Sequence, residues 1–409
     1  MMKIASLLLF LLPLPLLLCG QALPSAQTLR GVVSERSGGR PVPYATVVLA
    51  GVQPAVGTVT DSLGRFALTG VPVGRCDVEV SCLGYEPVLL KEILVGSSKE
   101  VVLHVRLQES LIAVGEVVVR PTVDKTQPLN SMALAGGRML SVEEASRYAG
   151  GMDDPARLVS SFAGVASTVG NNGIVVRGNA PKFLQWRMEG VEIPNPNHFA
   201  EVTTFGGGGL TALSSQVLGN SDFYTGAFPA EYGNALSGVF DIYLRNGNDT
   251  RREHTFQLGA LGIDVASEGP FSKRYDGSYL FNYRYSTLAL LTPLLPEDAD
   301  GTSYQDLSFK LHFPTRHAGD FSLWGVGLID RSGTVAETDP AKWAYDQDME
   351  NQDVRQYMGA AGLGHRLRIG RAASLRSTLA VTVSGLDMHT ERMTDEAVPL
   401  PQNVIRNTD

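Results

Sequence analysis

Apolar and polar residues alternate over long runs in the last third of the chain. The clearest run is 279–286, in which every second residue is aromatic: Tyr279, Phe281, Tyr283 and Tyr285. Successive side chains of a β-strand point to opposite faces, so this alternation predicts strands with one apolar and one polar face. The same alternation continues at 307–313, 324–328 and 379–384. We therefore expect residues 253–409 to form one sheet of antiparallel strands.

The length and aromatic content of these strands are typical of a transmembrane β-barrel wall, which turns apolar side chains to lipid and polar ones inward. A soluble β-sandwich also alternates, but the long polar link from Asp330 to Asp353 resembles an extracellular barrel loop. At roughly 22–26 residues per strand and loop, residues 253–409 allow about six or seven strands, whereas a barrel that encloses a folded domain has about 22. The polar end, 404–409, is expected to lie on no strand. We therefore expect an incomplete barrel that belongs to a longer protein.

Glycines separate short apolar strands in the middle of the chain, between residues 173 and 242. Single charged residues, such as Arg177 and Glu189, stand inside these strand-like runs. We expect this pattern in a compact domain held in a polar, water-lined lumen rather than in one with an ordinary apolar core. Arg177 and Glu189 are then expected to pair with each other or with the surrounding wall.

Two short helices are predicted before these strands. Ser141–Glu144 is a capping-box pattern that opens a helix to about Tyr148. A second helix opens at Asp153–Val159, with Pro155 in its first turn. Residues 131–250 are therefore expected to form an α+β domain.

Residues 28–109 predict a small β-sandwich, because short strand-like runs alternate with turn signals. The runs are 29–33, 45–49, 65–69, 76–82 and 101–107. Asp61 and Gly64 are expected to form a turn, after which Phe66 and Leu68 point into the core.

The first 26 residues are expected to be an export signal. Their apolar run, 4–18, is interrupted by proline and is too short for a membrane-spanning helix. Cleavage is expected after Ala22 or Ala26. Lipidation of Cys19 is the weaker alternative, because a bulky leucine precedes it. An exported protein without a later apolar run of 18 or more residues would need a β-barrel to stay in a membrane.

Charge and cysteine content narrow the function further. The formal net charge is −8 without a Lys/Arg-rich run, which argues against a nucleic-acid partner. Cys76 and Cys82 lie about 20 Å apart along one predicted strand, too far for a disulfide, and are expected to pack as small apolar residues.

The glycine-rich block resembles the plug domain of TonB-dependent outer-membrane receptors. The matching residues are the strand and turn with Arg177, Gly178 and Asn179, the pair Glu189 and Gly190 where many members have Asp-Gly, and the closing segment with Tyr232, Gly233, Ser237 and Gly238. The N-terminal sandwich resembles the carboxypeptidase regulatory-like domain through 31–33, 43–47, 60–66 and 84–87.

The resemblance implies a mainly β chain in five parts. These are a signal peptide at 1–26, a β-sandwich at 28–109, a linker at 110–130, a plug at 131–250 and barrel strands at 253–409. It implies an outer-membrane transporter and not an enzyme, with no cofactor. The sandwich and plug would face the periplasm, and the solute would be a siderophore, cobalamin, a glycan or a peptide.

The resemblance also implies partners. The TonB energy-coupling protein would grip the linker at Glu116, Val117, Val118 and Val119 by strand addition, and pull the plug. The alternative interpretation is that these residues form the last strand of the sandwich. Further expected partners are outer-membrane lipid, the substrate and a substrate-capturing surface lipoprotein.

A loop before Gly206–Gly209 is a candidate substrate-facing loop, with Asn195, Asn197 and His198 as its polar residues. The alternative is that this loop packs against the barrel. His198 also begins a His-x-x-Glu spacing of the kind found in zinc carboxypeptidases, with His312 or His317 as a distant third ligand. A zinc site needs a preformed scaffold that holds its ligands, and the sequence offers none, so no metal site is expected.

A secreted soluble module that binds carbohydrate or surface ligands is the rival hypothesis. It predicts a chain that stays soluble after signal cleavage, whereas the barrel hypothesis predicts an outer-membrane protein. The aromatic band of 279–285 favours the barrel.

Overall fold

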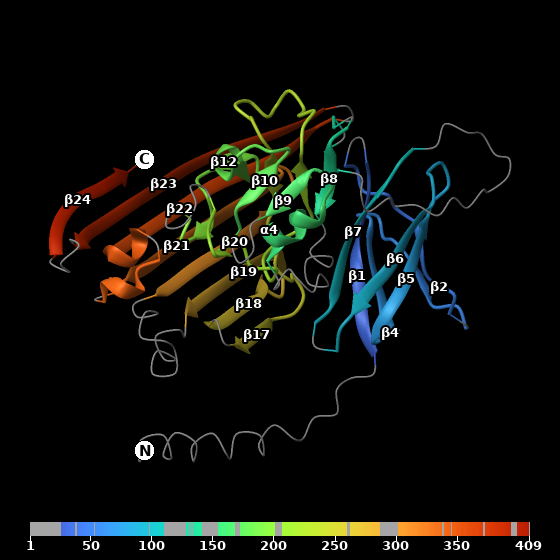
Figure 1. The fold of residues 1–409 in the computed structure, drawn as a ribbon. Helices are drawn as coiled ribbons and strands as arrows, with labels where there is room; N and C mark the ends of the chain where they lie inside the picture. The colour runs from blue at the N-terminus through green and yellow to red at the C-terminus, as the bar shows by residue number, and fades with distance from the viewer. Residues whose placement is uncertain are drawn as a thin grey trace, which may run out of the picture. The chain divides into compact units, whose positions relative to one another are not determined.

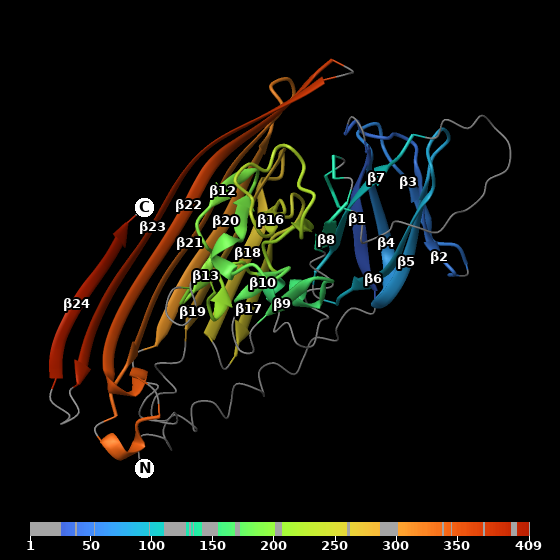
Figure 2. The ribbon, with the colours of Figure 1, turned by 45° about the horizontal axis from the view of Figure 1, so that its top comes forward.

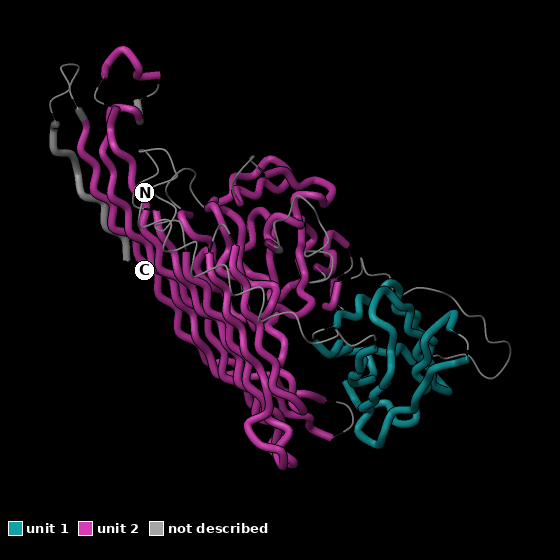
Figure 3. The backbone as a smooth tube through the Cα atoms, turned by 90° about the horizontal axis from the view of Figure 1, so that it is seen from below, with its two compact units in different colours: residues 1–124 teal, residues 125–409 magenta. Residues whose placement is uncertain are grey.

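The computed structural model describes residues 26–36, 39–52, 54–97, 99–109, 128–130, 132–133, 135–140, 154–167, 172–200, 207–259, 262–286, 302–337, 339–344, 346–370, 373–393 and 399–408. The chain divides into two compact units, residues 1–124 and 125–409 (Figure 3). The boundary lies inside the expected linker. The predicted helix at 141–148 and the segment 116–119 lie outside the described residues. No helix in the described ranges is long and apolar enough to cross a membrane.

The first unit is a β-sandwich of two sheets, one in the order β4-β1-β7 and the other in the order β3-β2-β5-β6 (Figure 1). Its strands are β1 Ala26–Glu35, β2 Thr46–Ala50, β3 Gly57–Val59, β4 Arg65–Pro72, β5 Gly74–Ser81, β6 Val88–Val95 and β7 Val101–Leu107. All five predicted runs form strands. The sequence missed β3, which is very short, and β6, where Glu92 has a φ of 54° and the alternation breaks.

The sandwich core is built from alternate residues of facing strands, including Leu29, Val47, Leu68 and Val80. The predicted turn is confirmed, since the Asp61 carboxylate accepts hydrogen bonds from the backbone N–H groups of Leu63 and Arg65, both at 2.8 Å. Gly64 has a φ of 72°, and a side chain there would collide with the Val33 carbonyl. The two free cysteines, Cys76 and Cys82, pack half-buried against this core, as expected.

The second unit contains two parts. We call its described residues from 128 to 250 the plug, and its eight-stranded sheet the wall. The plug is built on a five-stranded sheet in the order β12-β11-β16-β15-β8. These strands are β8 Gly137–Leu140, β11 Gln185–Met188, β12 Val191–Ile193, β15 Ser221–Tyr224 and β16 Val239–Ile242.

Short elements complete the plug. They are α4 Pro155–Leu158, η1 Val159–Ser161, η2 Pro181–Phe183, the pair β9 Val165–Ser167 and β10 Ile174–Val176, and the pair β13 Asn197–His198 and β14 Leu210–Thr211. Helix α4 starts as predicted, because the Asp154 side chain accepts a hydrogen bond from the Ala156 N–H at 2.8 Å and Pro155 stands in the first turn. This cap holds one of the N–H groups that a helix start leaves without a partner.

The plug has a compact apolar core on one face of its sheet, so the expectation of a plug without an ordinary apolar core is wrong. Alternation places Trp186 and Met188 on the same face as Phe240 and Ile242, and Trp186 stacks on Phe240 with ring centroids 4.3 Å apart. Glycines that suggested a polar domain stand instead in turns and at close approaches. A Cβ at Gly238, for example, would lie 3.0 Å from the Tyr224 carbonyl oxygen.

The wall is an antiparallel sheet of eight strands in sequence order (Figure 2). Its strands are β17 Glu253–Leu258, β18 Gly262–Ser272, β19 Tyr275–Ser286, β20 Ser303–Pro314, β21 Asp320–Thr334, β22 Glu350–Ile369, β23 Ala373–Met393 and β24 Pro399–Thr408. The estimate of six or seven strands was too low because several connections are short. The end of the chain is also not loop, since residues 404–408 pair with β23.

Both ends of the polar link from 330 to 353 are strand. Pairing between β21 and β22 continues as far as Thr334 and Gln352, because backbone pairing does not require apolar side chains. The remaining connection, 335–349, contains the 3-10 turns η5 Pro340–Lys342 and η6 Asp346–Met349. The expected long loop is therefore shorter than the sequence suggested.

Strand β19 has the two faces that the alternation predicted. Phe281, Tyr283 and Tyr285 are exposed, whereas Leu280 and Asn282 are fully buried against the plug side. Strand β21 reverses this rule: Trp324, Val326 and Leu328 face inward and join the plug core. The expectation of apolar side chains on the outer face is wrong there because the inner face meets an apolar partner instead of water.

Three aromatic rings of the wall lie over glycines directly opposite on the next strand. The register pairs are Phe309 with Gly325, Trp324 with Gly362, and Tyr357 with Gly385. A Cβ at any of these glycines would collide with the facing ring. The glycines therefore make room for the rings.

Candidate functional site at the plug–wall interface

Charged and polar side chains on the inner face of the wall bind the plug. They come from five neighbouring strands: Glu268, Arg284, Asp306, Lys310, Asp330 and Gln356. All of them except Arg284 are buried, and Arg284 is half-buried. A charge removed from water is stable only with a partner, so these contacts define a specific docking arrangement.

The hairpin of β13 and β14 places His198 between two wall carboxylates. Its Nε2 lies 3.0 Å from Asp306 Oδ2 on β20, and its Nδ1 lies 3.2 Å from Asp330 Oδ2 on β21. All three side chains are 0% exposed. The Tyr304 ring packs against the imidazole with centroids 4.8 Å apart. His198 is therefore enclosed by wall residues on several sides.

Backbone groups of the same hairpin are also bound by the wall. The N–H of Phe199 donates to Asp330 at 3.1 Å, and the N–H of Ala200 donates to the Gln356 side chain at 3.0 Å. Gln356 in turn donates to the Asn197 carbonyl at 3.2 Å. Arg284 binds the second strand of the hairpin by donating a hydrogen bond to the Thr211 carbonyl.

The ionisation state of His198 follows from these partners. Burial lowers the pKa of His198, but the hydrogen bonds and negative charges of Asp306 and Asp330 outweigh it, so the net pKa is raised from 6.5. Arg284 donates twice to Asp306, at 2.9 and 2.8 Å, so a second positive group faces that carboxylate. The ring is thus favoured in its charged form.

Two further ion pairs connect the plug and the wall. Lys310 Nζ lies 2.7 Å from Glu189 Oε1 and also donates to the Leu244 carbonyl at 2.8 Å. Arg245 forms a two-pronged pair with Glu268, at 2.6 and 2.7 Å. With His198 charged, these contacts join four acidic side chains (Glu189, Glu268, Asp306, Asp330) to four basic ones (Arg245, Arg284, Lys310, His198). These eight charges therefore balance one another.

Arg177 and Glu189 do not sit in strands, as the sequence suggested, but in the tight turns that follow β10 and β11. Arg177 and Gly178 have φ values of 50° and 84°, and Glu189 and Gly190 have φ values of 52° and 89°. Positive φ at both central positions is the geometry of a type I′ hairpin turn. Glu189 binds the wall through Lys310, whereas the Arg177 guanidinium lies beside Gly226. The two side chains therefore serve different contacts.

The remaining plug-motif residues support the polar face of the plug sheet. The Asn179 side chain donates to the Val176 carbonyl at 3.1 Å and closes the first turn. The Tyr232 hydroxyl donates to Asp241 at 2.8 Å, and the Gly233 carbonyl accepts from Gln185 at 2.9 Å. Ser237 is buried in the same segment. These residues hold the plug together and do not line an open site.

The expected substrate-facing role of Asn197 and His198 is contradicted by their burial. Both side chains are 0% exposed, because wall residues cover the loop from the side that the sequence left open. Asn195 is half-buried, and its side-chain Oδ1 accepts from the Asn197 side chain at 2.7 Å. The other interpretation, a loop packed against the wall, agrees with these contacts.

The zinc-peptidase interpretation fails on the geometry of His198. Each ring nitrogen faces a carboxylate oxygen, which leaves no lone pair for a metal. Within the described ranges, no group of three or more His, Cys, Asp or Glu side chains is arranged to hold a metal ion.

Sequence reasoning missed the wall partners of the plug. Asp306 and Asp330 lie 108 and 132 residues from His198 along the chain, so nothing local connects them. A signal was nevertheless present. Arg284, Asp306 and Lys310 all occupy the alternate, polar positions of their strands. These positions form the face that the alternation assigned to the lumen.

A second buried polar cluster, also missed, lies on the other face of the plug sheet. Asp222 and Asp241 stand opposite each other on β15 and β16. Asp222 accepts from the N–H groups of Leu129 and Asn130 at 2.7 and 3.0 Å. It therefore fastens the segment through which the chain enters the plug.

Comparison with known proteins identifies the first unit. A family model for the carboxypeptidase regulatory-like domain matches residues 28–108. The N-terminal sandwich is a carboxypeptidase regulatory-like domain. No curated protein matches the chain.

Solved structures similar to the chain include three receptors. The ferric enterobactin receptor PfeA from Pseudomonas aeruginosa, a variant in complex with enterobactin, is 15% identical, with 67% of this chain and 45% of that chain covered and a TM-score of 0.39. The siderophore receptor PirA from the same organism is 14% identical, with 63% of this chain and 40% of that chain covered and a TM-score of 0.36. The hemophore receptor HasR from Serratia marcescens, a double mutant in complex with its hemophore and heme, is 12% identical. The match covers 63% of this chain and 39% of that chain, with a TM-score of 0.42.

These structures are TonB-dependent outer-membrane receptors. This chain spans less than half the length of each of the three. All three TM-scores lie below 0.5, so the function proposed below rests on the residues and contacts of this chain.

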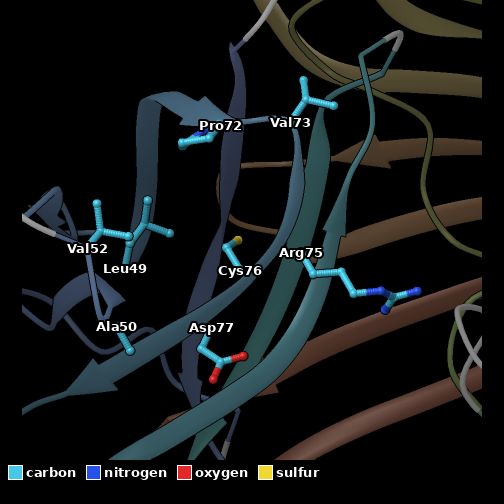
Figure 4. Close-up of a pocket in the computed structure, with 8 residues that line it drawn as sticks. All are labelled: Leu49, Ala50, Val52, Pro72, Val73, Arg75, Cys76 and Asp77. Carbon is cyan, nitrogen blue, oxygen red and sulfur yellow. The ribbon is translucent and has the colours of Figure 1, made fainter.

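The regulatory-like domain has its own small cavity, of about 330 Å³, at one end of the sandwich. It is lined by apolar residues such as Leu49 and Val73 together with Cys76, while Arg75 extends away from the other labelled side chains (Figure 4). Burial raises the pKa of the Cys76 thiol, and a protonated thiol is a poor nucleophile. The cavity therefore lacks an activated group.

At its C-terminal end the regulatory-like domain is tied together by polar contacts. Glu35 accepts from the Tyr85 hydroxyl at 2.8 Å and pairs with Arg40 at 2.6 Å, and Arg40 also reaches Glu109 at 3.4 Å. Burial and the adjacent Glu35 raise the pKa of Tyr85 to about 12. These contacts hold the domain's last described residue, Glu109, against its body.

Proposed function

We propose that the chain is part of a TonB-dependent outer-membrane receptor, which imports a scarce solute by energy-coupled movement of the plug against the wall. The observation that carries this proposal is the plug–wall interface. A folded plug is bound to the inner face of a long antiparallel sheet through buried ion pairs and a shared apolar core, while the sheet's outer face exposes apolar and aromatic side chains. Such a two-faced wall is suited to lipid on one side and a plug on the other.

The proposed solute is a siderophore, cobalamin, a glycan or a peptide. The proposed partners are TonB, outer-membrane lipid and a substrate-capturing surface lipoprotein, with the sandwich and plug on the periplasmic side. TonB would bind Glu116, Val117, Val118 and Val119 by strand addition, which uses backbone N–H and C=O groups. The residues proposed to contact solute include Asn195.

Fractionation and TonB binding test this function together. The intact protein is expected in the outer-membrane fraction and resistant to carbonate extraction. The purified C-terminal domain of TonB is expected to bind it, and Val118→Pro should abolish binding because proline has no N–H to donate. Val118→Ile is the matched control and should bind normally.

A protein recovered in the soluble fraction after signal cleavage would overturn the receptor proposal and favour a secreted binding module. Membrane insertion with TonB binding unaffected by Val118→Pro would instead move the coupling segment elsewhere in the chain.

A further inference from the structure

His198 faces one carboxylate through each ring nitrogen. The groups around it are Asp306 and Tyr304 from β20, Asp330 from β21, and Arg284 from β19, which pairs with Asp306. Gln356 from β22 is a neutral polar neighbour that binds the adjacent backbone. No solvent reaches the imidazole or the two carboxylates, which are all 0% exposed.

The arrangement around His198 requires one proton more than a neutral imidazole supplies. An ionised carboxylate only accepts hydrogen bonds, so the ring can bond to both carboxylates only if both of its nitrogens carry a hydrogen. A neutral imidazole has one N–H, and the cluster must therefore bind one additional proton. With it, Arg284 and His198 balance Asp306 and Asp330. Without it, a net negative charge remains in a site closed to water.

We propose that His198 is a positioning residue whose positive charge fastens the β13–β14 hairpin of the plug to β20 and β21 of the wall. Release of this corner of the plug then requires that the ring loses its proton or its two carboxylate partners. A role for this release in transport rests on the proposed function. The contact between the hairpin and the wall depends on neither TonB nor solute.

The direction of the pH dependence follows from the raised pKa of His198. A group whose pKa is higher in the docked state stabilises that state fully below its pKa in the released state, near 6.5. The stabilisation is lost as the pH rises through the docked-state pKa. The hairpin is therefore expected to be tightest below pH 6.5 and to loosen as the pH rises through the raised pKa of His198.

Hydrogen exchange on the intact protein in detergent micelles tests this proposal. The reporters are four N–H groups of the hairpin, each with a known acceptor: Phe199 to Asp330, Ala200 to Gln356, Gly209 to the His198 carbonyl, and Ala212 to the Pro196 carbonyl. Protection is corrected for the intrinsic exchange rate at each pH. In the unaltered protein it should fall as the pH is raised above 6.5, while protection in strand β16 stays constant.

Variants separate charge from shape. His198→Gln should lower protection of the reporters by about a hundredfold at pH 6.5, because it leaves a buried negative charge uncompensated, and should flatten the pH profile. The double variant H198Q/D330N restores charge balance and should recover at least about tenfold of that loss, also with a flat profile. Glu189→Gln, which breaks the separate pair with Lys310, is the matched control and should keep the pH dependence.

A flat profile in the unaltered protein would overturn the proposal without any variant, so the test survives a variant that does not fold. The single variant D330N completes the comparison. If the losses of protection in H198Q and in D330N simply add in the double variant, the proposal is also overturned, because the two side chains then act through shape alone. Neither result touches the receptor function, which the fractionation and TonB experiments decide.

Discussion

Lys310 illustrates how a single wall residue serves the plug. Its ammonium group is buried and has two plug acceptors, the Glu189 carboxylate and the Leu244 carbonyl. The Glu189 carboxylate also accepts from the Leu244 N–H at 2.9 Å, so the three groups form a closed set. Removing one charge from such a set leaves the other in a medium that solvates it poorly.

Lys310→Met is therefore expected to lower the free energy of unfolding by about 3–5 kcal/mol. Urea unfolding in detergent micelles, followed by the fluorescence of Trp186 in the plug and Trp324 in the wall, measures the change. The double variant K310M/E189Q should be less destabilised than K310M, because no buried charge remains.

The contrasting residue is Arg331, whose pair with Asp353 at 2.9 Å is exposed. Arg331→Ala should change the free energy of unfolding by less than about 1 kcal/mol, because water replaces an exposed partner. Similar losses for K310M and R331A would show that burial does not decide the strength of these pairs.

Strand β8 is the element that connects the chain's entry segment to the rest of the plug. It is the edge strand of the five-stranded sheet and pairs only with β15 among the described strands of that sheet. Asp222, at the centre of that pairing, also holds the backbone of Leu129 and Asn130. One carboxylate therefore fixes the entry segment to the strand beside β8.

Asp222→Asn is expected to loosen this entry segment. An amide offers one acceptor oxygen in place of two charged ones, and hydrogen bonds to a charged group stabilise by about 1.5–3 kcal/mol. Exchange at the amides of Leu129 and Asn130 should accelerate by about ten- to a hundredfold, while the wall is unaffected. The Tyr224 hydroxyl donates to the same carboxylate at 2.9 Å. Tyr224→Phe removes only this one hydrogen bond and should accelerate exchange less. Equal acceleration in the two variants would show that the tyrosine holds the entry segment.

Period-2 alternation allowed the elements of the wall to be predicted, but not all of their contacts. Strand β19 has the exposed aromatic face that its pattern indicated. Strand β21 has the same alternation with the opposite orientation, because alternation tells which residues share a face and not which partner that face meets. For the same reason, the sequence did not predict that two carboxylates lie beside His198, because their positions depend on pairing between distant strands.

At the scale of the whole second unit, the outer face of the wall exposes rows of apolar side chains. On β23 alone, Leu379 and Val381 are 74% and 70% exposed, and Val383 lies on the same face. Water-exposed aliphatic residues in a row are unfavourable, whereas lipid accommodates them. The outer face is thus the surface on which the membrane proposal depends.

Val381→Arg should reduce stable membrane insertion, because an arginine on a lipid-facing barrel position costs up to about 2–4 kcal/mol. The measurement is the fraction of protein that resists carbonate extraction from outer membranes. Thr382→Arg, one residue along on the inner face, is the matched control and should insert normally. Equal insertion of the two variants would contradict a lipid-facing outer surface.

The rings that cover glycines bear on how the wall assembles. A strand that slips by two residues keeps every side chain on its correct face, so alternation alone does not prevent that error. Tyr357, however, would meet Val383 or Asp387 in place of Gly385 after a slip in either direction. The misaligned pair clashes before further strands can add to it. At this pair, the correct register is therefore the one that leaves room for the ring, and neighbouring strands can reject a two-residue slip as they assemble.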